Sequence, residues 1–354
     1  MGWPSDEPLA WFGGCLATGL EEVSHDPAAL DSAGWWAVVA TFEGALTAAR
    51  FRDVRDAPLP PGEWCTDQVG DWTSSLDQAA YEAAVVHVRE QIAAGEVYQA
   101  NICRVLTAPC PDPADLVGLA RVLDAGNPAP YGGVVRLPSH DVRVATASPE
   151  LFLRRDHDWV MSGPIKGTGL TASDLGAKDR AENVMITDLV RNDLGAVAVT
   201  GSVEVPDLCA VEQHPGLVHL VSRVTARLRP EVGWAQLLAS TFPPGSVSGA
   251  PKSSALRIIG DVEPVARGPY CGAVGWVDAD RHQAVLAVGI RTFWLAGGSL
   301  RFGTGAGITW GSDPAREWEE TELKARHLVG LAGGAATRTV GVPTPERVSG
   351  RIVP

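Results

Sequence analysis

The chain has 354 residues, of which 45% are apolar and 20% are charged, and its formal net charge at pH 7 is −13. This composition is typical of a globular protein that can bury a large core, and it excludes a disordered chain. The negative charge argues against nucleic acid as a partner, because a surface that binds phosphates is basic.

Cysteine usage and the first residues indicate where the protein works. The six cysteines are scattered without a C-x-x-C pair, which is typical of reduced cytosolic thiols and disfavours a zinc site. The chain starts with neither the basic nor the apolar region of a secretory signal, and it has no run of about 18 apolar residues. We therefore expect a cytoplasmic protein without a membrane partner.

The first third of the chain is predicted to contain both strands and helices. A run of apolar and β-branched residues predicts a strand over 34–42, and apolar residues at helical spacing predict a helix over 76–94 that ends at Gly95. The strand predicted over 96–104 carries Gln99, which is either a polar residue on a half-buried face or a hydrogen-bond partner of a ligand. A helix over 112–125 and a strand over 131–137 follow.

A predicted hairpin then brings an acid and an amine together. The runs 151–155 and 159–161 flank a short polar segment, which indicates two strands and a turn. Antiparallel partners about a turn near residue 158 have numbers that sum to roughly 316, which pairs Glu150 with Lys166 at the open end. The pair is either an ion pair on a solvated edge or part of a functional site.

Lys166 lies in the segment GPIKGTG (163–169), whose three glycines let a ligand approach the backbone closely. A lysine is a nucleophile only when it is neutral, and at its reference pKa of about 10.4 roughly one molecule in 2,500 is neutral at pH 7. Burial or a neighbouring cation must therefore lower the pKa of Lys166 if this residue reacts.

The next segments offer groups that bind carboxylates. A glycine-, proline- and serine-rich loop over 241–252 precedes a helix predicted from about residue 253, and the backbone N–H groups at such a helix start can hold an anion. Arg291, on a strand predicted over 284–292, can bind a carboxylate bidentately, and a glycine-rich turn at 303–308 lets main-chain donors reach the same anion. The loop candidates for ligand contact are Ser248, Gly249 and Lys252.

Two predicted helices, 179–189 and 313–324, each present a pair of carboxylates three residues apart on one face. The four carboxylates are Asp179, Glu182, Glu317 and Glu320. Mg²⁺ typically takes one or two protein carboxylates together with waters and substrate oxygens, so the two helices could form a magnesium site. Alternatively, Glu320 pairs with Lys324 four residues later and the other carboxylates lie in water.

Ten segments of the chain resemble the chorismate-utilising enzymes, most closely the aminodeoxychorismate synthase component I group, with the anthranilate synthase component I group as the near relative. They are GEVYQAN (95–101), ASPELFL (147–153), PIKGT (164–168), DRAENVMITDLVRNDLG (179–195), VEQHPGLVHLVSRV (211–224), FPPGSVSGAPK (242–252), RGPYCGAVGWV (267–277), AVGIRT (287–292), GTGAGI (303–308) and DPAREWEET (313–321). They occur in the family's order and together are highly specific.

The resemblance implies an α/β (α+β) fold. It implies a single large domain of two packed, mainly antiparallel β-sheets with helices outside. We expect residues 1–74 to complete the sheets, residues 75–335 to form the chorismate-binding catalytic core, and residues 336–354 to form a C-terminal tail.

The resemblance also assigns roles to site residues. It implies that Glu182 and Glu320 bind Mg²⁺ directly, that Asp179 and Glu317 help through water, and that the ion holds the ring carboxylate of chorismate. The residues implied for the enolpyruvyl carboxylate are Arg291, Tyr270 and the backbone of Gly305, Ala306 and Gly307. The further candidate substrate contacts are Thr168, Ser248, Gly249 and Lys252.

The implied chemistry is amination of the chorismate ring. Glu150 would act as general acid on the 4-hydroxyl and later as base, with His219 near that hydroxyl. Gln99 stands where isochorismate and salicylate synthases carry a lysine that activates water, which disfavours water as the nucleophile. Lys166 stands where the anthranilate enzymes generally have alanine. In the aminodeoxychorismate enzymes this lysine is proposed to attack C2 of the ring before ammonia attacks C4.

The expected product is therefore 4-amino-4-deoxychorismate, the precursor of p-aminobenzoate and folate. Because no segment resembles a glutamine amidotransferase, the ammonia should come from a separate amidotransferase subunit.

Two alternatives stay open. One is anthranilate synthesis with Lys166 as a bystander, and the other is a chorismate-binding protein without catalysis, because Gly169 follows Thr168 where the family usually has arginine. No counterpart of the tryptophan-binding motif of feedback-inhibited anthranilate synthases is found.

Overall fold

The structure is a computed structural model, and it describes residues 7–112, 114–169, 171–214 and 217–333. The C-terminal tail predicted over 336–354 lies outside the described residues. The helices are α1 (Gln78–Ala93), α2 (Leu116–Gly126), α3 (Ala177–Gly195), α4 (Trp234–Thr241), α5 (Gly245–Ser248), α6 (Lys252–Val262) and α7 (Pro314–Ala332). The 3-10 turns are η1 (Pro27–Asp31), η2 (Thr66–Gln68), η3 (Pro138–His140) and η4 (Ala172–Asp174).

The strands join into one large sheet. The first nine are β1 (Leu9–Phe12), β2 (Cys15–Ser24), β3 (Trp35–Ala40), β4 (Leu46–Asp56), β5 (Thr73–Ser74), β6 (Gln99–Pro109), β7 (Tyr131–Leu137), β8 (Val142–Ser148) and β9 (Leu151–Asp156). The other nine are β10 (Trp159–Gly163), β11 (Ile165–Gly169), β12 (Glu204–His214), β13 (Leu217–Arg227), β14 (Gly249–Ala250), β15 (Ala273–Asp278), β16 (Gln283–Val288), β17 (Thr292–Ala296) and β18 (Ser299–Ile308).

Every strand pair in the described residues is antiparallel, and the pairing is continuous. It runs β5–β6–β18–β17–β8–β7–β1–β2–β4–β3–β15–β16–β9–β10–β13, with β11 and β12 also on β13 and β14 on β6. The N-terminal strands enter this sheet through β1, which pairs with β7, and through β3, which pairs with β15.

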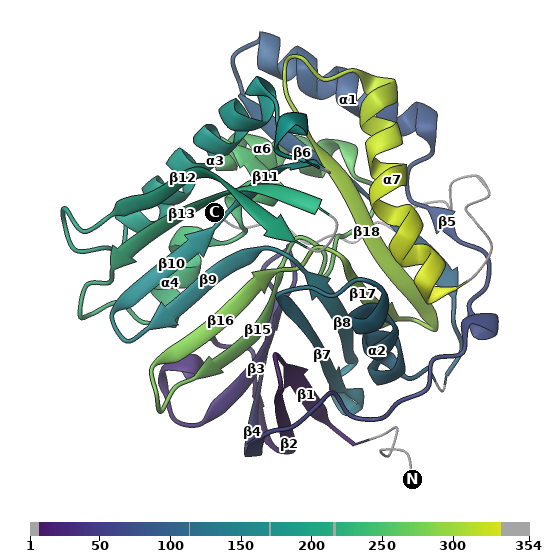
Figure 1. The fold of residues 1–354 in the computed structure, drawn as a ribbon, viewed down its shortest axis with the longest axis vertical. Coiled ribbons are helices and arrows are strands. Elements are labelled where there is room, and N and C mark those ends of the chain that lie inside the picture. The colour runs from purple at the N-terminus through teal and green to yellow at the C-terminus, as the bar shows by residue number, and fades with distance from the viewer. Residues whose placement is uncertain (1–6, 113, 170, 215–216, 334–354) are drawn as a thin grey trace.

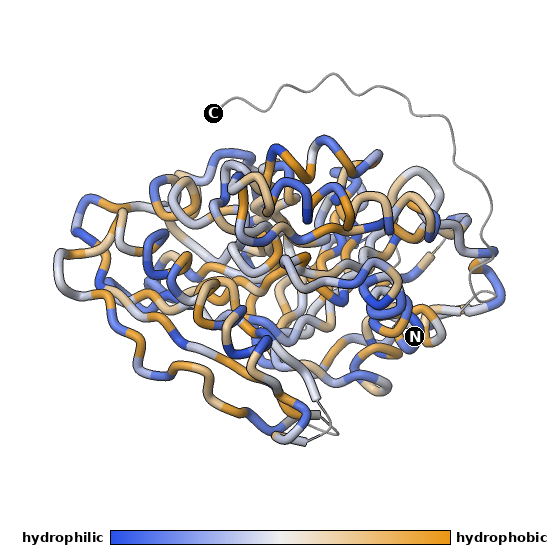
Figure 2. The backbone as a smooth tube through the Cα atoms, turned by 90° about the horizontal axis from the view of Figure 1, so that it is seen from above, coloured by the Kyte–Doolittle hydropathy of each residue, from blue (hydrophilic) through white to orange (hydrophobic). Residues whose placement is uncertain are grey.

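The two halves of the sheet pack against each other, and helices cover the outside. Val105 on β6 and Val135 on β7 belong to the same buried cluster as Val39 on β3 and Val274 on β15. Figure 1 shows α7 running along β18 with α1 beside it, and α2 next to β7 and β8. Figure 2 shows hydrophobic and hydrophilic stretches interspersed along the backbone tube. The predicted fold class is confirmed, with the difference that hydrogen bonds join the two sheets into one.

Local sequence signals explain the helices that position the site. The side chain of Asp77 accepts the backbone N–H of Ala80 and caps α1, and Gly95 follows the helix with a φ of 80° that favours glycine. Asp313 caps α7 in the same way, with Pro314 at the first helical position. Within the described residues, no helix has the length and apolar character needed to cross a lipid bilayer.

Two predicted elements are wrong. The segment 303–308 is not a turn but part of β18, where Gly305 pairs with Cys103 on β6. Glycine is required there for close approach: a Cβ on Gly305 would lie 2.5 Å from the carbonyl oxygen of Ile102. The strand predicted over 284–292 is split into β16 and β17, and Arg291 lies between them with a φ of 52°. The left-handed backbone at Arg291 interrupts the ladder.

Candidate active site

Glu150 and Lys166 lie close together, although not in the predicted register. β9 and β10 pair Val160 with Arg155, and the register then shifts between Met161 and Gly163. Pro164 has no N–H to donate, so the ribbon ends there and the chain continues as β11, in which Lys166 pairs with Leu220 of β13. The predicted cross-strand pairing is therefore wrong, but the predicted proximity is confirmed, since the charges of Lys166 and Glu150 influence each other's pKa.

Ser246, at the start of α5, joins the two groups. The Lys166 Nζ donates to the carbonyl oxygen of Ser246 at 2.9 Å, and the Ser246 side chain hydrogen-bonds the Glu150 carboxylate. The backbone N–H of Ile165 also donates to Glu150. The predicted site residues did not include Ser246, although it lies in the loop that was singled out. Its position between an acid and an amine could be seen only in the folded chain.

Burial shifts the pKa of both groups in the direction that favours their neutral forms. Glu150 is 4% exposed, and this burial raises its pKa to about 7, against the opposing effects of the Ser246 hydrogen bond and the Lys166 charge. Burial also lowers the pKa of Lys166, with Glu182 and Glu150 acting in the opposite direction. Perturbed groups that face each other in this way are typical of functional sites.

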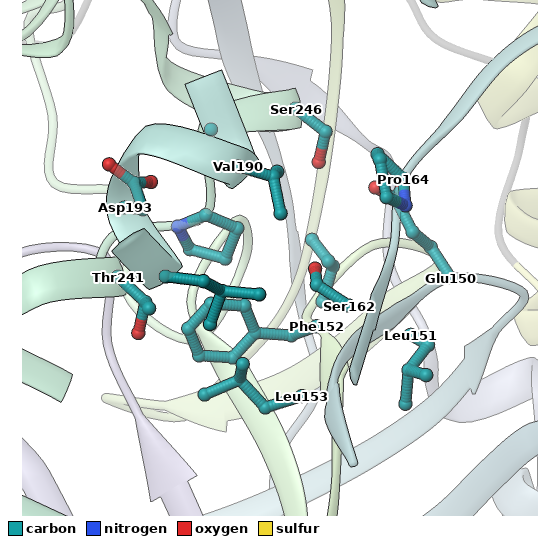
Figure 3. Close-up of a pocket in the computed structure, with 14 residues that line it drawn as sticks. Glu150, Leu151, Phe152, Leu153, Ser162, Pro164, Val190, Asp193, Thr241 and Ser246 are labelled. Atoms are coloured by element: carbon teal, nitrogen blue, oxygen red, sulfur yellow. The ribbon is translucent and has the colours of Figure 1, made fainter. Parts of the chain in front are cut away.

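A small recess lies beside this pair. Figure 3 shows Glu150 at one side of the recess and Asp193 and Thr241 at the other, with Phe152 and Val190 between them. Its volume of about 10 Å³ leaves room for about one water molecule. The recess is therefore too small for a ring-sized ligand.

Gln99 and Lys166 reach the same point on β18. A Cβ on Gly307 would lie 2.2 Å from Gln99 Nε2 and 3.6 Å from Lys166 Nζ. Gln99 is 1% exposed, and its Oε1 has no hydrogen-bond partner within the described residues. An unsatisfied buried acceptor is costly in a folded protein, which favours a ligand-binding role for Gln99 over a core role.

Thr168 and His219 add a second polar pair on neighbouring strands. They are directly opposite on β11 and β13, and Thr168 Oγ1 lies 2.9 Å from His219 Nδ1. His219 is 3% exposed. Lys166 and Thr168 are two residues apart on β11, so β11 and β13 bring three of the predicted residues into one region.

Carboxylates from α3 and α7 converge on one ammonium group. The Lys178 Nζ lies 3.8 Å from Glu182 Oε1 and 3.6 Å from Glu317 Oε1. Burial raises the pKa of Glu182 and of Glu317, and the charge of Glu317 adds to the shift of Glu182. Lys178 was not among the predicted site residues, although its spacing of four residues from Glu182 is that of a helical ion pair.

The other two predicted metal ligands have protein partners. Glu320 Oε1 lies 2.6 Å from Lys324 Nζ, which is the alternative pairing that the sequence left open. Asp179 accepts the backbone N–H of Gly176 at 2.8 Å and so caps α3. No three metal-binding side chains come together in the described part of the chain. Glu182 and Glu317 nevertheless fit a hard divalent ion, because they offer carboxylate oxygens from two helices to one position where a cation, the Lys178 ammonium, already lies.

The guanidinium of Arg291 is available for an anion. It is half-buried, burial alone lowers its pKa, and it makes no hydrogen bond or ion pair with any described residue. Tyr270 is 4% exposed, its ring packs on Gly303, and its hydroxyl lies 3.9 Å from Cys103 Sγ. The carbonyl of Gly305 accepts from Lys324 Nζ at 3.0 Å.

The loop candidates have internal partners. Lys252 Nζ donates to Asp193 Oδ2 at 2.8 Å, and the Ser248 hydroxyl donates to the carbonyl of Pro244 at 3.0 Å. Gly249 pairs with Ala100 in the short ladder between β14 and β6. Ser248 thus closes the loop on itself, Lys252 ties it to α3, and Gly249 ties it to β6, which together fix the segment that carries Ser246.

Replacing Glu150 with glutamine is expected to stabilise the protein at alkaline pH. The folded-state pKa of about 7 exceeds the value of about 4.3 for an unfolded glutamate, so the stability cost of burying this group grows as the pH rises from about 4.3 to about 7. The melting temperature of Glu150→Gln relative to wild type should therefore rise between pH 5 and 7 and stay constant above. The exposed Glu319→Gln serves as the control. A pH-independent difference would contradict the assignment.

Comparison with known proteins agrees with this geometry. Residues 47–330 match the family of chorismate binding enzymes. The chain is 38% identical over 301 residues to anthranilate synthase component 1 of Haloarcula marismortui, covering 81% of this chain and 60% of that protein. It is 35% identical over 270 residues to aminodeoxychorismate synthase component 1 of Salmonella typhimurium, covering 73% and 58%. The chain thus spans about three fifths of the length of these relatives.

Solved structures share the fold. Anthranilate synthase component I of Streptococcus pneumoniae superposes with a TM-score of 0.75 at 23% identity, over 93% of this chain and 91% of that one. The menaquinone-specific isochorismate synthase of Escherichia coli gives a TM-score of 0.76 at 19% identity, over 93% and 90%. With the family match over most of the chain, these comparisons establish that the chain belongs to the family of chorismate-binding enzymes.

Proposed function

We propose that the protein catalyses amination of chorismate at C4, as component I of an aminodeoxychorismate synthase, for p-aminobenzoate and folate synthesis. The observation that carries the proposal is Lys166, whose amine lies with Glu150 and Gln99 at the centre of the candidate site. A lysine there supplies the nucleophile that distinguishes this reaction from anthranilate synthesis.

Charge complementarity supports chorismate, a dicarboxylate, as the substrate. Arg291 would bind the enolpyruvyl carboxylate, with the β18 backbone at Gly305 to Gly307 beside it. Glu182 and Glu320 would hold Mg²⁺ directly, with Asp179 and Glu317 acting through water. When bound, this ion supplies the positive charge that neutralises the ring carboxylate.

One proton transfer prepares the two catalytic groups. Because burial opposes the charged form of both groups, moving a proton from the Lys166 ammonium to Glu150 leaves a neutral amine beside a carboxylic acid. Lys166 then forms a bond to C2 of the ring, both ring double bonds shift toward C4 (C1=C2 to C1=C6, and C5=C6 to C4=C5), and the C4–O bond breaks. Glu150 donates its proton to the departing 4-hydroxyl, which leaves as water.

Ammonia completes the reaction. It attacks C4, both double bonds shift back to their original positions, and the C2–N bond to Lys166 breaks with its electrons returning to the lysine. Glu150, now a carboxylate, accepts the proton that the new amine gives up. The ammonia would come from a separate glutamine amidotransferase subunit, a proposal in keeping with the name component 1 that both relatives carry.

Product analysis tests the proposal. Purified protein with Mg²⁺, chorismate and ammonium should yield 4-amino-4-deoxychorismate, detected as p-aminobenzoate after addition of a lyase. Fluorescent anthranilate formed without the lyase would instead establish anthranilate synthesis, which the similarity to the Haloarcula enzyme favours as the second candidate. Tight chorismate binding without turnover in either assay would indicate a binding protein and contradict both.

A further inference from the structure

The ammonium group of Lys178 lies between a carboxylate of α3 and a carboxylate of α7, where a bound metal cation could also lie. It lies in the first turn of α3, within 4 Å of Glu182 on the same helix and of Glu317 on α7. The lysine side chain is 56% exposed, whereas the two carboxylates are 16% and 6% exposed. The ammonium group therefore lies between the two carboxylates and the solvent.

The distribution of lysine in the chain makes this position distinctive. The chain has 25 arginines but only four lysines, at positions 166, 178, 252 and 324. The charges of Lys166, Lys178 and Lys324 all act on Glu320, and Lys252 pairs with Asp193 at the edge of the recess. The positive side chains elsewhere in the described chain are arginines, so lysine is confined to the neighbourhood of the site.

The geometry lets Lys178 leave without disturbing the fold. An exposed lysine has a long, flexible, strongly hydrated side chain, and a single exposed ion pair contributes little to stability. A divalent ion brings two positive charges where the ammonium brings one. Other charged groups that act on the pair are Asp179, Lys166, Glu320 and Lys324, each of which has its own partner described above.

We propose that Lys178 is an internal counter-ion that competes with a divalent cation for Glu182 and Glu317 and so sets the affinity of the site for that cation. In the metal-free protein its ammonium holds the two carboxylates of α3 and α7 together. Binding of the divalent ion displaces the ammonium into solvent. This inference rests on the proposed function, in which Glu182 binds the ion directly and Glu317 acts through water.

Direct titration of the protein with Mg²⁺ by calorimetry, and with Mn²⁺ by electron paramagnetic resonance, tests the competition. Lys178→Met should bind either ion about three- to fivefold more tightly than wild type, the size expected when the competition from two exposed ion pairs is lost. The control is Arg180→Met, which removes an exposed positive charge two residues away on the same helix. It should change the affinity by much less.

Thermal unfolding gives an independent readout. Without divalent ions, Lys178→Met should melt below wild type, because its two carboxylates repel each other, and saturating Mg²⁺ should remove the difference. Equal or weaker ion binding by Lys178→Met, or an equal gain in Arg180→Met, would overturn the competition. Failure of the proposed function is seen separately, in the products that wild-type protein forms from chorismate.

Discussion

Replacing Lys166 with methionine is expected to lower kcat/KM for chorismate amination by at least about a thousandfold, since the covalent route loses its nucleophile. Methionine keeps the length and apolar character of the lysine stem, so the substitution removes the amine and little else. The rate is measured as p-aminobenzoate formed in the lyase-coupled assay. The mass of the intact protein is measured after incubation with chorismate without ammonia, and only wild type should show an adduct.

The matched control for this prediction is Lys324→Met. Lys324 is a neighbouring lysine that contacts Glu320 and the carbonyl of Gly305, but it does not contact Ser246. It should retain the adduct. If Lys166→Met keeps a rate within about threefold of wild type and forms anthranilate, Lys166 is a bystander and the second candidate function is correct.

Replacing Glu150 with glutamine is expected to lower kcat/KM by about 10² to 10⁴, the usual contribution of a general acid. Glutamine cannot donate a proton to the 4-hydroxyl but fills the same space. Because the pKa of Glu150 is about 7, the wild-type rate should fall as the pH rises above 7 and the acid is lost. The pH profile of Glu150→Gln should lack this alkaline decline.

The control for the pH profile is Glu319→Gln, which changes an exposed carboxylate on α7. Its profile should match that of wild type. The neutral fraction of Lys166 rises with pH, so the wild-type profile should be bell-shaped. The two apparent pKa values of this profile describe the interacting pair of Glu150 and Lys166 rather than either residue alone. An unchanged alkaline limb in Glu150→Gln would assign the acid to another group.

The proposed function requires a protein with a net charge of −13 to bind a dianion, and positive groups at the site favour this. The Arg291 side chain has no hydrogen-bond or ion-pair partner within the described residues, and Lys166 and Lys178 face the cluster of carboxylates. Nearby charges act on a ligand far more strongly than distant ones in salt, so these groups influence the ligand more than the distant acidic surface does.

The sequence by itself determined the local structure of the site. The caps Asp77 and Asp313 and the spacing of Glu317 and Glu320 depend only on neighbours within one or two helical turns. The order of family segments likewise indicated the fold, and the resemblance implied the role that is proposed for Lys166. These properties can be predicted from the sequence because they depend on contacts between residues that are close in the sequence.

The tertiary structure alone decided how these pieces meet. Because the β9–β10 ladder ends at Pro164, Lys166 pairs with β13. In this position its amine reaches the carbonyl of Ser246, eighty residues away in the sequence. Lys178 likewise needed α7 to bring Glu317 to it. Strand register, burial and the pKa shifts that follow from burial depend on contacts between distant segments, and no local pattern of residues specifies those contacts.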